Sequence, residues 1–242
     1  INGGSAADLF GYSVSLSKNK NYIAVGAPYG LNTRGYVRVY YYDGSSWGQV
    51  GDDLEGAQPS PNGEYFGKKV VISEDGSRLV VSAPQYYFST GKVNLYSVNQ
   101  ASDSITLLDS KIGSLFFTRT GHSLDLKSNI LAVSETGFTS PKIIMYDISS
   151  DSFLEQANNT IPLLYAFDIQ IKLSYDGNNL IYGMSGFNSD SGIINSRRML
   201  GTKGHVEIFK RENNHWTRQG WKMKPIGGGA TDEFGKSVSI SG

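Results

Sequence analysis

Cysteine is absent from this 242-residue sequence, and its absence removes several kinds of chemistry at once. Disulfides, thiolate metal sites and cysteine nucleophiles are excluded together, but the lack of cysteine does not decide whether the protein works in an oxidising or a reducing compartment. Long apolar runs are missing too, since no stretch approaches the roughly 18 residues that a membrane-spanning helix requires. We therefore expect a soluble chain with no direct membrane insertion.

An excess of either charge is also lacking, because 22 Lys and Arg residues balance 22 Asp and Glu residues. A balanced surface has no net field to attract nucleic acid or an anionic membrane, so we expect no nucleic-acid partner. The sequence is rich instead in glycine (29) and tyrosine (15), which favours short strands and tight turns over helices.

A long internal repeat organises the chain. The stretch LFGYSVSLSKNKNYIAVGAP at 9–28 recurs as YFGKKVVISEDGSRLVVSAP at 65–84. The marker glycines Gly11, Gly67 and Gly121 are spaced by 56 and 54 residues, a period typical of repeat architectures. Weaker copies begin near positions 168 and 235.

Each copy predicts four antiparallel strands. In the first strand, alternation places Val14 and Leu16 on one face, and Ser13, Ser15 and Ser17 on a polar face. A tight turn leads to a nearly continuous apolar second strand, as expected of a strand covered on both faces. The third strand carries an aromatic residue at one shared position, and the fourth strand is polar enough to lie at an outer edge. The shared aromatic positions are Tyr40, Tyr96, Tyr146 and Phe209.

Small residues recur near the end of the second strand, where we expect two backbones to approach closely. These residues are Gly26, Ser82, Ser134 and Gly183.

These patterns predict an all-β fold, a β-propeller of four-stranded antiparallel blades with four complete repeats and the first strand of a fifth. A β-sandwich is the alternative. The single propeller segment would span 1–242, with blades at approximately 9–56, 65–113, 119–160 and 165–224 and the next blade starting within 226–242. Because one first strand is surplus, we expect a longer propeller, or an assembly in which missing sequence or a neighbouring copy completes the fifth blade.

The first two copies resemble a known family. The motifs DLFGYSVSLS, IAVGAP and GYVRVY, with their second copies EYFGKKVVIS, LVVSAP and GKVNLY, are similar to FG-GAP repeats, the blades of propellers of the integrin α-subunit type. The resemblance implies an extracellular or surface-exposed propeller used for adhesion, ligand binding or structural assembly. Later copies keep the strand pattern but replace the GAP corner with SETG and GMSG.

Many integrin-type blades hold Ca²⁺ through alternating Asp or Asn oxygens between the first and second strands. Here the hairpins offer at most the adjacent carboxylates Glu74 and Asp75, whereas Ca²⁺ needs six to eight converging oxygens. We therefore predict neither a metal nor another cofactor.

The chemistry-bearing residues favour a non-enzymatic role. The three histidines lack zinc spacing, and no nucleophile motif of the Gly-x-Ser-x-Gly type occurs. We expect a protein or glycan partner on a surface, and neighbouring copies in an assembly. The alternatives are a hydrolase or lyase with an axial active site, built from residues such as Glu135, and a lectin-like glycan-binding propeller.

Three kinds of site are expected: a partner contact, glycan stacking and glycosylation. The long insertion at 185–203 predicts a partner contact through Ile194, Arg197, Arg198 and Met199. Glycan stacking is left open for Tyr42 and Trp221. The acceptor pattern at Asn158 predicts glycosylation in a loop after a fourth strand.

Overall fold

A computed structural model describes residues 1–57, 63–137, 140–163, 168–185, 204–213, 215–226 and 233–241. The described part of the chain forms four sheets, each with four antiparallel strands in chain order. No helix in these ranges has the length and apolarity needed to cross a membrane.

The strands follow the predicted repeat closely. Sheet 1 contains β1 (Ser13–Leu16), β2 (Tyr22–Ala27), β3 (Tyr36–Tyr42) and β4 (Trp47–Glu55). Sheet 2 contains β5 (Val70–Ile72), β6 (Arg78–Ala83), β7 (Lys92–Asn99) and β8 (Ser104–Ile112). Sheet 3 contains β9 (Leu124–Lys127), β10 (Ile130–Glu135), β11 (Lys142–Asp147) and β12 (Leu154–Pro162). Sheet 4 contains β13 (Ile169–Leu173), β14 (Asn179–Met184), β15 (His205–Glu212) and β16 (His215–Met223).

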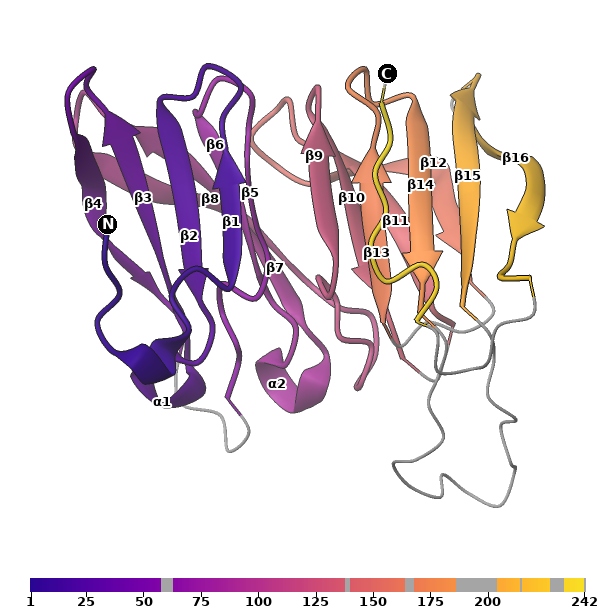
Figure 1. Cartoon of the computed structure of the whole chain (residues 1–242), viewed down its shortest axis with the longest axis horizontal. Helices are drawn as coiled ribbons and strands as arrows, with labels where there is room; N and C mark the ends of the chain where they lie inside the picture. Colours follow the sequence, from indigo (N-terminus) through magenta and orange to yellow (C-terminus); the bar gives the residue numbers. More distant parts are fainter. Residues whose placement is uncertain are drawn as a thin grey trace.

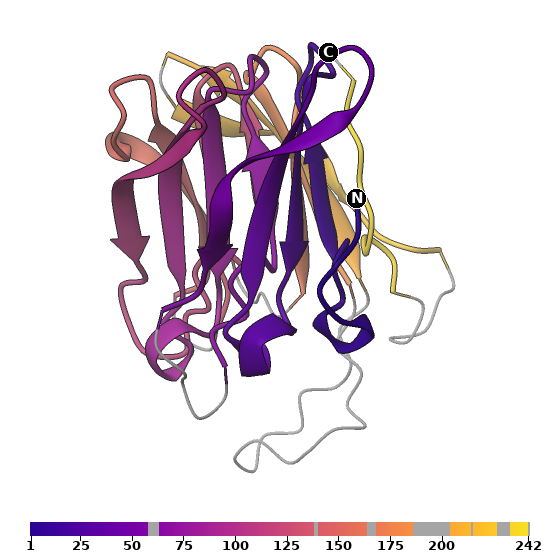
Figure 2. The same cartoon turned by 90° about the vertical axis from the view of Figure 1, so that its left-hand side faces the viewer.

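Within the described ranges, three short helical elements accompany the sheets: η1 (Ala6–Asp8), α1 (Gly30–Thr33) and α2 (Tyr86–Ser89). All three lie at the lower end of the molecule in Figures 1 and 2. We call this end the loop face and the opposite end, where the first strand of each sheet turns into the second, the hairpin face.

The sheets pack face to face in chain order, and three apolar cores fill the spaces between them. Val37 and Val39 of sheet 1 pack with Leu79 of sheet 2 in the first core. The second core lies between sheets 2 and 3, and the third between sheets 3 and 4. Sheets 1 and 4 share no such core among the described residues, so the row of sheets is not closed (Figure 1).

The shared aromatic position in the third strands is confirmed. Tyr40 pairs with Ile23, and the three later residues pair with Leu79, Leu131 and Leu180 at the same register. Tyr40, Tyr96 and Tyr146 are buried, and Phe209 packs at the edge of the third core. Because the register repeats, the repeat in the sequence is also a repeat in side-chain placement.

Hydroxyl groups join neighbouring first strands, which corrects the interpretation of Ser13 and Ser15 as a merely polar face. The Ser13 hydroxyl oxygen accepts from the Val70 amide at 2.9 Å, and Ser15 accepts from Ile72 at 3.0 Å. Ser123 accepts from Ile171 at 3.1 Å in the same way between sheets 3 and 4. These contacts satisfy amides on the inner edge that have no strand partner.

The open end of the row leaves β1 uncovered. Val14 and Leu16 are 54% and 52% exposed, whereas the equivalent Val70 and Ile72 of sheet 2 are buried. At the other end, the segment 233–241 lies alongside sheet 4 (Figure 1), and a side chain at Gly183 would overlap the carbonyl oxygen of Gly235.

Candidate functional site

The corners of the loop face have a left-handed backbone at successive residues. In sheet 2, Tyr87 and Phe88 have φ of 41° and 51°, and Leu31 and Asn32 occupy the same places in sheet 1 with φ of 52° and 56°. Bulky residues adopt this conformation at a cost, so the surrounding structure must hold it. In sheet 2 the Gly91 amide does so by donating to the Tyr86 carbonyl at 3.1 Å.

An exposed aromatic patch results at this corner. The ring centroid of Tyr87 lies 5.2 Å from that of Phe88 and 5.9 Å from that of Phe116, and Phe88 and Phe116 are 6.0 Å apart. Their exposed fractions are 57%, 65% and 58%, and the flanking Leu115 and Phe117 are exposed as well. We call Tyr87, Phe88, Leu115, Phe116 and Phe117 the loop-face patch.

A buried carboxylate anchors the segment that contributes half of this patch. Glu135, at the end of β10, accepts hydrogen bonds from Ser114 and Thr120, each at 3.1 Å, and lies 3.5 Å from the Lys142 ammonium. The Phe117 amide then donates to the Phe88 carbonyl at 3.3 Å, which joins the two halves. Glu135, the residue suggested for an axial active site, therefore positions a surface loop in this structure.

A second aromatic cluster continues the loop face toward sheet 1. The ring of Tyr29 lies 6.2 Å from Tyr12 and 5.0 Å from Tyr65. The Lys68 ammonium sits 4.1 Å from the centroid of the Tyr12 ring. The two clusters connect through the backbone, because the residue after Glu64 is Tyr65, the residue after Gln85 is Tyr86, and the Gln85 amide donates to the Glu64 carbonyl.

Sequence reasoning missed this patch, although a signal was present. The six-residue loop QYYFST at 85–90 holds three aromatic residues, and the linker SLFF at 114–117 holds two more. Each stretch alone has the composition of a strand or a core segment. Only the tertiary pairing of the two loops shows that their side chains gather on one exposed surface.

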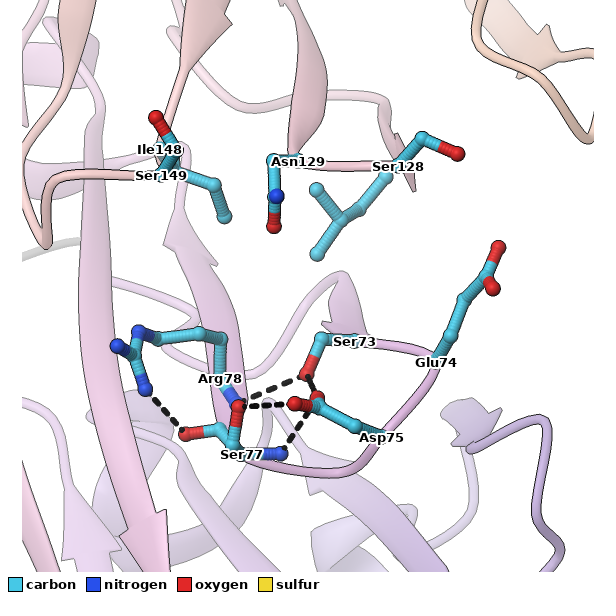
Figure 3. Close-up of a pocket in the computed structure, with 10 residues that line it drawn as sticks. Ser73, Glu74, Asp75, Ser77, Arg78, Ser128, Asn129, Ile148 and Ser149 are labelled. Atoms are coloured by element: carbon cyan, nitrogen blue, oxygen red, sulfur yellow. Dashed lines mark hydrogen bonds between the residues drawn. The ribbon is translucent and has the colours of Figure 1, made fainter.

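The hairpin face holds a polar cleft between sheets 2 and 3, with a volume of about 320 Å³. Figure 3 shows the turn of sheet 2 on one side and the turns of sheet 3 on the other. Leu126 and Ile148 provide its apolar contacts. The remaining lining residues are polar or charged: Ser73, Glu74, Asp75, Ser77, Arg78, Ser128, Asn129 and Ser149.

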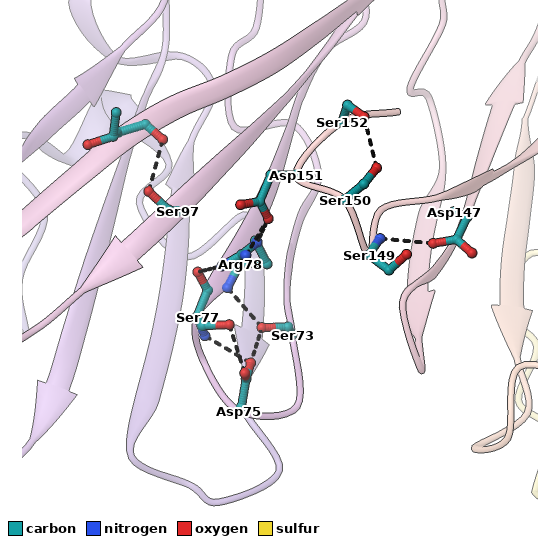
Figure 4. A network of polar contacts seen from close by, with 11 residues as sticks. Ser73, Asp75, Ser77, Arg78, Ser97, Asp147, Ser149, Ser150, Asp151 and Ser152 are labelled. Atoms are coloured by element: carbon teal, nitrogen blue, oxygen red, sulfur yellow. Dashed lines mark hydrogen bonds and ion pairs between the residues drawn. The ribbon is translucent and has the colours of Figure 1, made fainter. Parts of the chain in front are cut away.

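Most of the charged groups around this cleft are already engaged, as Figure 4 shows. The Asp75 carboxylate accepts from the hydroxyls of Ser73 at 2.6 Å and Ser77 at 2.7 Å. Burial alone would raise the pKa of Asp75, but these hydrogen bonds outweigh it and lower the pKa. Arg78 is paired with Asp151 of the neighbouring sheet, with Nε 2.7 Å from the carboxylate. The network therefore closes the turn and joins two sheets.

The described residues contain no cluster of three or more His, Asp or Glu side chains placed to hold a metal ion. The hairpins of sheets 1, 2 and 4 instead share an internal hydrogen bond from a serine to an Asx side chain: Ser17 to Asn19, Ser73 to Asp75, and Ser174 to Asp176.

Charged side chains also meet along the inner strands. The Lys69 ammonium donates to Gln170 at 3.3 Å, and the pKa of Lys69 is lowered by burial and by the nearby Lys172 and Lys68 ammonium groups. Lys172 pairs with the buried Asp125 at 3.3 Å. These contacts hold the inner strands together, and the Asp168 carboxylate also acts electrostatically on Lys69 and on His122.

The residues expected to bind are not brought together. The Tyr42 ring of sheet 1 packs against Trp47 in a tilted arrangement with centroids 5.2 Å apart, whereas Trp221 is 91% exposed on β16 of sheet 4. The expectation that Asn158 lies in a loop is wrong for its backbone, which belongs to the outer strand β12. The partner-contact residues of the insertion lie outside the described residues: Ile194, Arg197, Arg198 and Met199.

Comparison with solved structures agrees with the sheet arrangement. Hydrazine synthase from Kuenenia stuttgartiensis superposes with a TM-score of 0.52 at 11% identity, covering 85% of this chain and 53% of that one. TolB from Acinetobacter baumannii gives a TM-score of 0.45 at 13% identity, covering 85% of this chain and 42% of that one. The chain thus spans about half the length of these structures. No protein-family model matches the sequence, and neither does any curated protein.

The four-stranded antiparallel sheets and this likeness place the chain in the all-β class of β-propellers, as an open row of blades. At identities this low, the likeness concerns the fold alone.

Proposed function

We propose that this chain is a non-enzymatic recognition module that binds a partner protein through the loop-face patch. The observation that carries the proposal is the contact of three exposed rings, Tyr87, Phe88 and Phe116, contributed by two different blades. A rigid array of blades with aromatic side chains at its loop tips is suited to presenting a binding surface.

The size of the patch supports this reading. An aromatic side chain has roughly 150 to 250 Å² of surface, so three rings exposed to nearly three-fifths contribute on the order of 300 to 400 Å². Leu115 and Phe117 extend this area further. Exposed apolar patches of this size on a single protein are often functional, and aromatic residues dominate the centres of protein interfaces.

We also propose that the blades are FG-GAP repeats, and that the protein lies at a surface or outside the cell and acts in adhesion or assembly. The assignment to FG-GAP repeats is supported by the shared role of the marker glycines. Gly11, Gly67 and Gly121 each donate their amide to the second strand of the same blade, at 3.1, 2.9 and 2.9 Å. The marker glycine of the repeat therefore makes the same backbone hydrogen bond in three blades.

Glycan binding is a second candidate, favoured by one observation. The Trp221 ring is almost completely exposed on an outer strand, so it does not contribute to an apolar core. An exposed indole can stack on the apolar face of a sugar ring.

One pair of variants separates the two candidates. In pull-downs with the immobilised 242-residue chain from the surface fraction of the source organism, Phe88→Ala/Phe116→Ala should abolish protein capture, and Trp221→Ala should preserve it. On a glycan array, Trp221→Ala should remove binding while the double variant retains it. Protein capture unchanged by the double variant, with folding verified by circular dichroism, would refute the proposal.

A further inference from the structure

Two cations beside the loop-face patch form no direct ion pair with a carboxylate of the described residues, although the buried Glu64 carboxylate acts electrostatically on Lys92. Lys92 lies over the Tyr86 ring at 5.2 Å, and Arg119 is exposed two residues after Phe117. Neither forms an ion pair with a carboxylate of the described chain within 4.0 Å. Elsewhere on the loop face Arg34 does have such a partner, Glu55 at 3.1 Å.

The second aromatic cluster repeats this combination. Lys68 lies over Tyr12 and within 5.9 Å of the Tyr29 ring, and it too forms no ion pair with a carboxylate in the described part of the chain. The ammonium group of each lysine faces an aromatic ring, whose negative π face substitutes for an acid. The loop face therefore alternates exposed rings with positive charges across blades 1, 2 and 3.

This local charge differs from that of the whole protein, whose acidic and basic residues balance. A partner that buries the rings must also desolvate or neutralise Lys68, Lys92 and Arg119. Burying an unpaired charge is unfavourable, and a carboxylate on the partner would remove that cost and add attraction at the rim.

We infer that the loop-face patch binds an acidic apolar peptide segment, with carboxylates flanking aromatic or aliphatic side chains. This inference rests on the proposed function and names the chemistry of its partner. The apolar side chains contact Phe88 and Phe116, and the carboxylates pair with Lys92 and Arg119 at one side and with Lys68 at the other. A basic or neutral segment of the same apolar content leaves these cations unpaired.

The test uses a peptide array in which each acidic apolar sequence has a partner with Asp and Glu replaced by Lys and Arg. The acidic member of each pair should bind more tightly, by at least about tenfold for a pair of satisfied charges. Its affinity should fall as salt concentration rises, because exposed charge pairs are screened. Equal binding of acidic and basic members would overturn the inference.

Variants of the chain distinguish this inference from the proposed function. Lys92→Glu/Arg119→Glu should reverse the preference toward basic peptides, and Phe88→Ala/Phe116→Ala should weaken binding to both members. Lys20→Glu/Lys127→Glu, at two lysines of the hairpin face, is the matched charge control and should change neither. If the aromatic variant abolishes protein capture while the charge variant leaves peptide preference unchanged, the inference fails and the proposed function stands.

An anionic membrane is the competing source of negative charge. Vesicles of phosphatidylcholine with and without phosphatidylserine provide this arm of the experiment. Binding to the phosphatidylserine vesicles that depends on Lys92 and Arg119, without selection of acidic peptides, would also contradict the inference.

Discussion

The carbonyl oxygen of Gly67 occupies the space where a side chain at Gly26 would begin, so two neighbouring blades meet there backbone against backbone. Gly183 and the Gly235 carbonyl repeat this approach at the other end of the row. The expectation of close approach at this position is thereby confirmed for both glycines.

Gly26→Ala should destabilise the fold by about 3 kcal/mol, because the added methyl overlaps a backbone atom that cannot move aside easily. Gly48→Ala is the matched control, since nothing lies within 4 Å of a methyl group there. Urea unfolding followed by circular dichroism measures both. Similar unfolding midpoints for the two variants would show that the backbones at Gly26 and Gly67 leave room for a methyl group.

The turn of sheet 2 depends on the Asp75 side chain. Asp75→Ala should cost about 1 kcal/mol, because the Ser77 amide and the Ser73 hydroxyl lose their acceptor. Asp75→Asn should cost less, since Asn19 performs the same function in sheet 1. Equal losses for both variants would assign the effect to the charge and exclude the hydrogen bonds as its cause.

Removal of divalent metal should leave stability unchanged. The hairpin carboxylates Asp75 and Asp176 already accept hydrogen bonds from their own turns, so folding does not require a cation to satisfy them. Thermal unfolding with and without a chelator tests this point. A midpoint lowered by more than about 5 °C, corresponding to roughly 1 kcal/mol, would contradict it.

Acid should destabilise the protein through His205. Burial and the nearby Lys222 and Lys224 lower the pKa of His205 to about 4, although Glu207 opposes the shift. A lowered pKa in the folded state means that stability is full above the unfolded value of about 6.5 and is lost as pH falls toward 4. When the pH falls from 7 to 5, the unfolding free energy of His205→Phe should decrease by about 1 to 2 kcal/mol less than that of the wild type. Parallel pH profiles would exclude His205 as the cause.

A buried acceptor joins sheets 3 and 4. The Asp125 carboxylate accepts from the Leu173 amide at 2.7 Å, so Asp125→Ala leaves a buried amide unsatisfied and should cost about 2 kcal/mol. Asp125→Asn keeps an acceptor and should lose less, because the pair with the half-exposed Lys172 contributes little. Chemical denaturation of the wild type, Asp125→Ala and Asp125→Asn measures both losses in unfolding free energy.

The repeating parts of the fold were predictable because they follow from local pattern. Alternation in the first strand and the shared position of Tyr40 and Tyr96 both fix which side chains share a face, and the structure bears them out. The role of Ser13 was not predictable, since a period of two separates two faces without saying which one meets the next blade. The loop-face patch was missed for a related reason. Its two halves, near Phe88 and Phe116, are joined only by tertiary packing.

The corners of blades 1 and 2 follow nearly the same left-handed path, yet one displays Leu31 and Asn32 and the other Tyr87 and Phe88. In each corner a glycine amide, Gly35 or Gly91, closes the turn through main-chain atoms alone. The identity of the two tip residues is therefore decoupled from the shape of the loop that carries them. Exchanging these dipeptides between corners would move two exposed aromatic side chains from one blade to the next and separate them from Phe116, while the hydrogen bonds that close both turns stay the same.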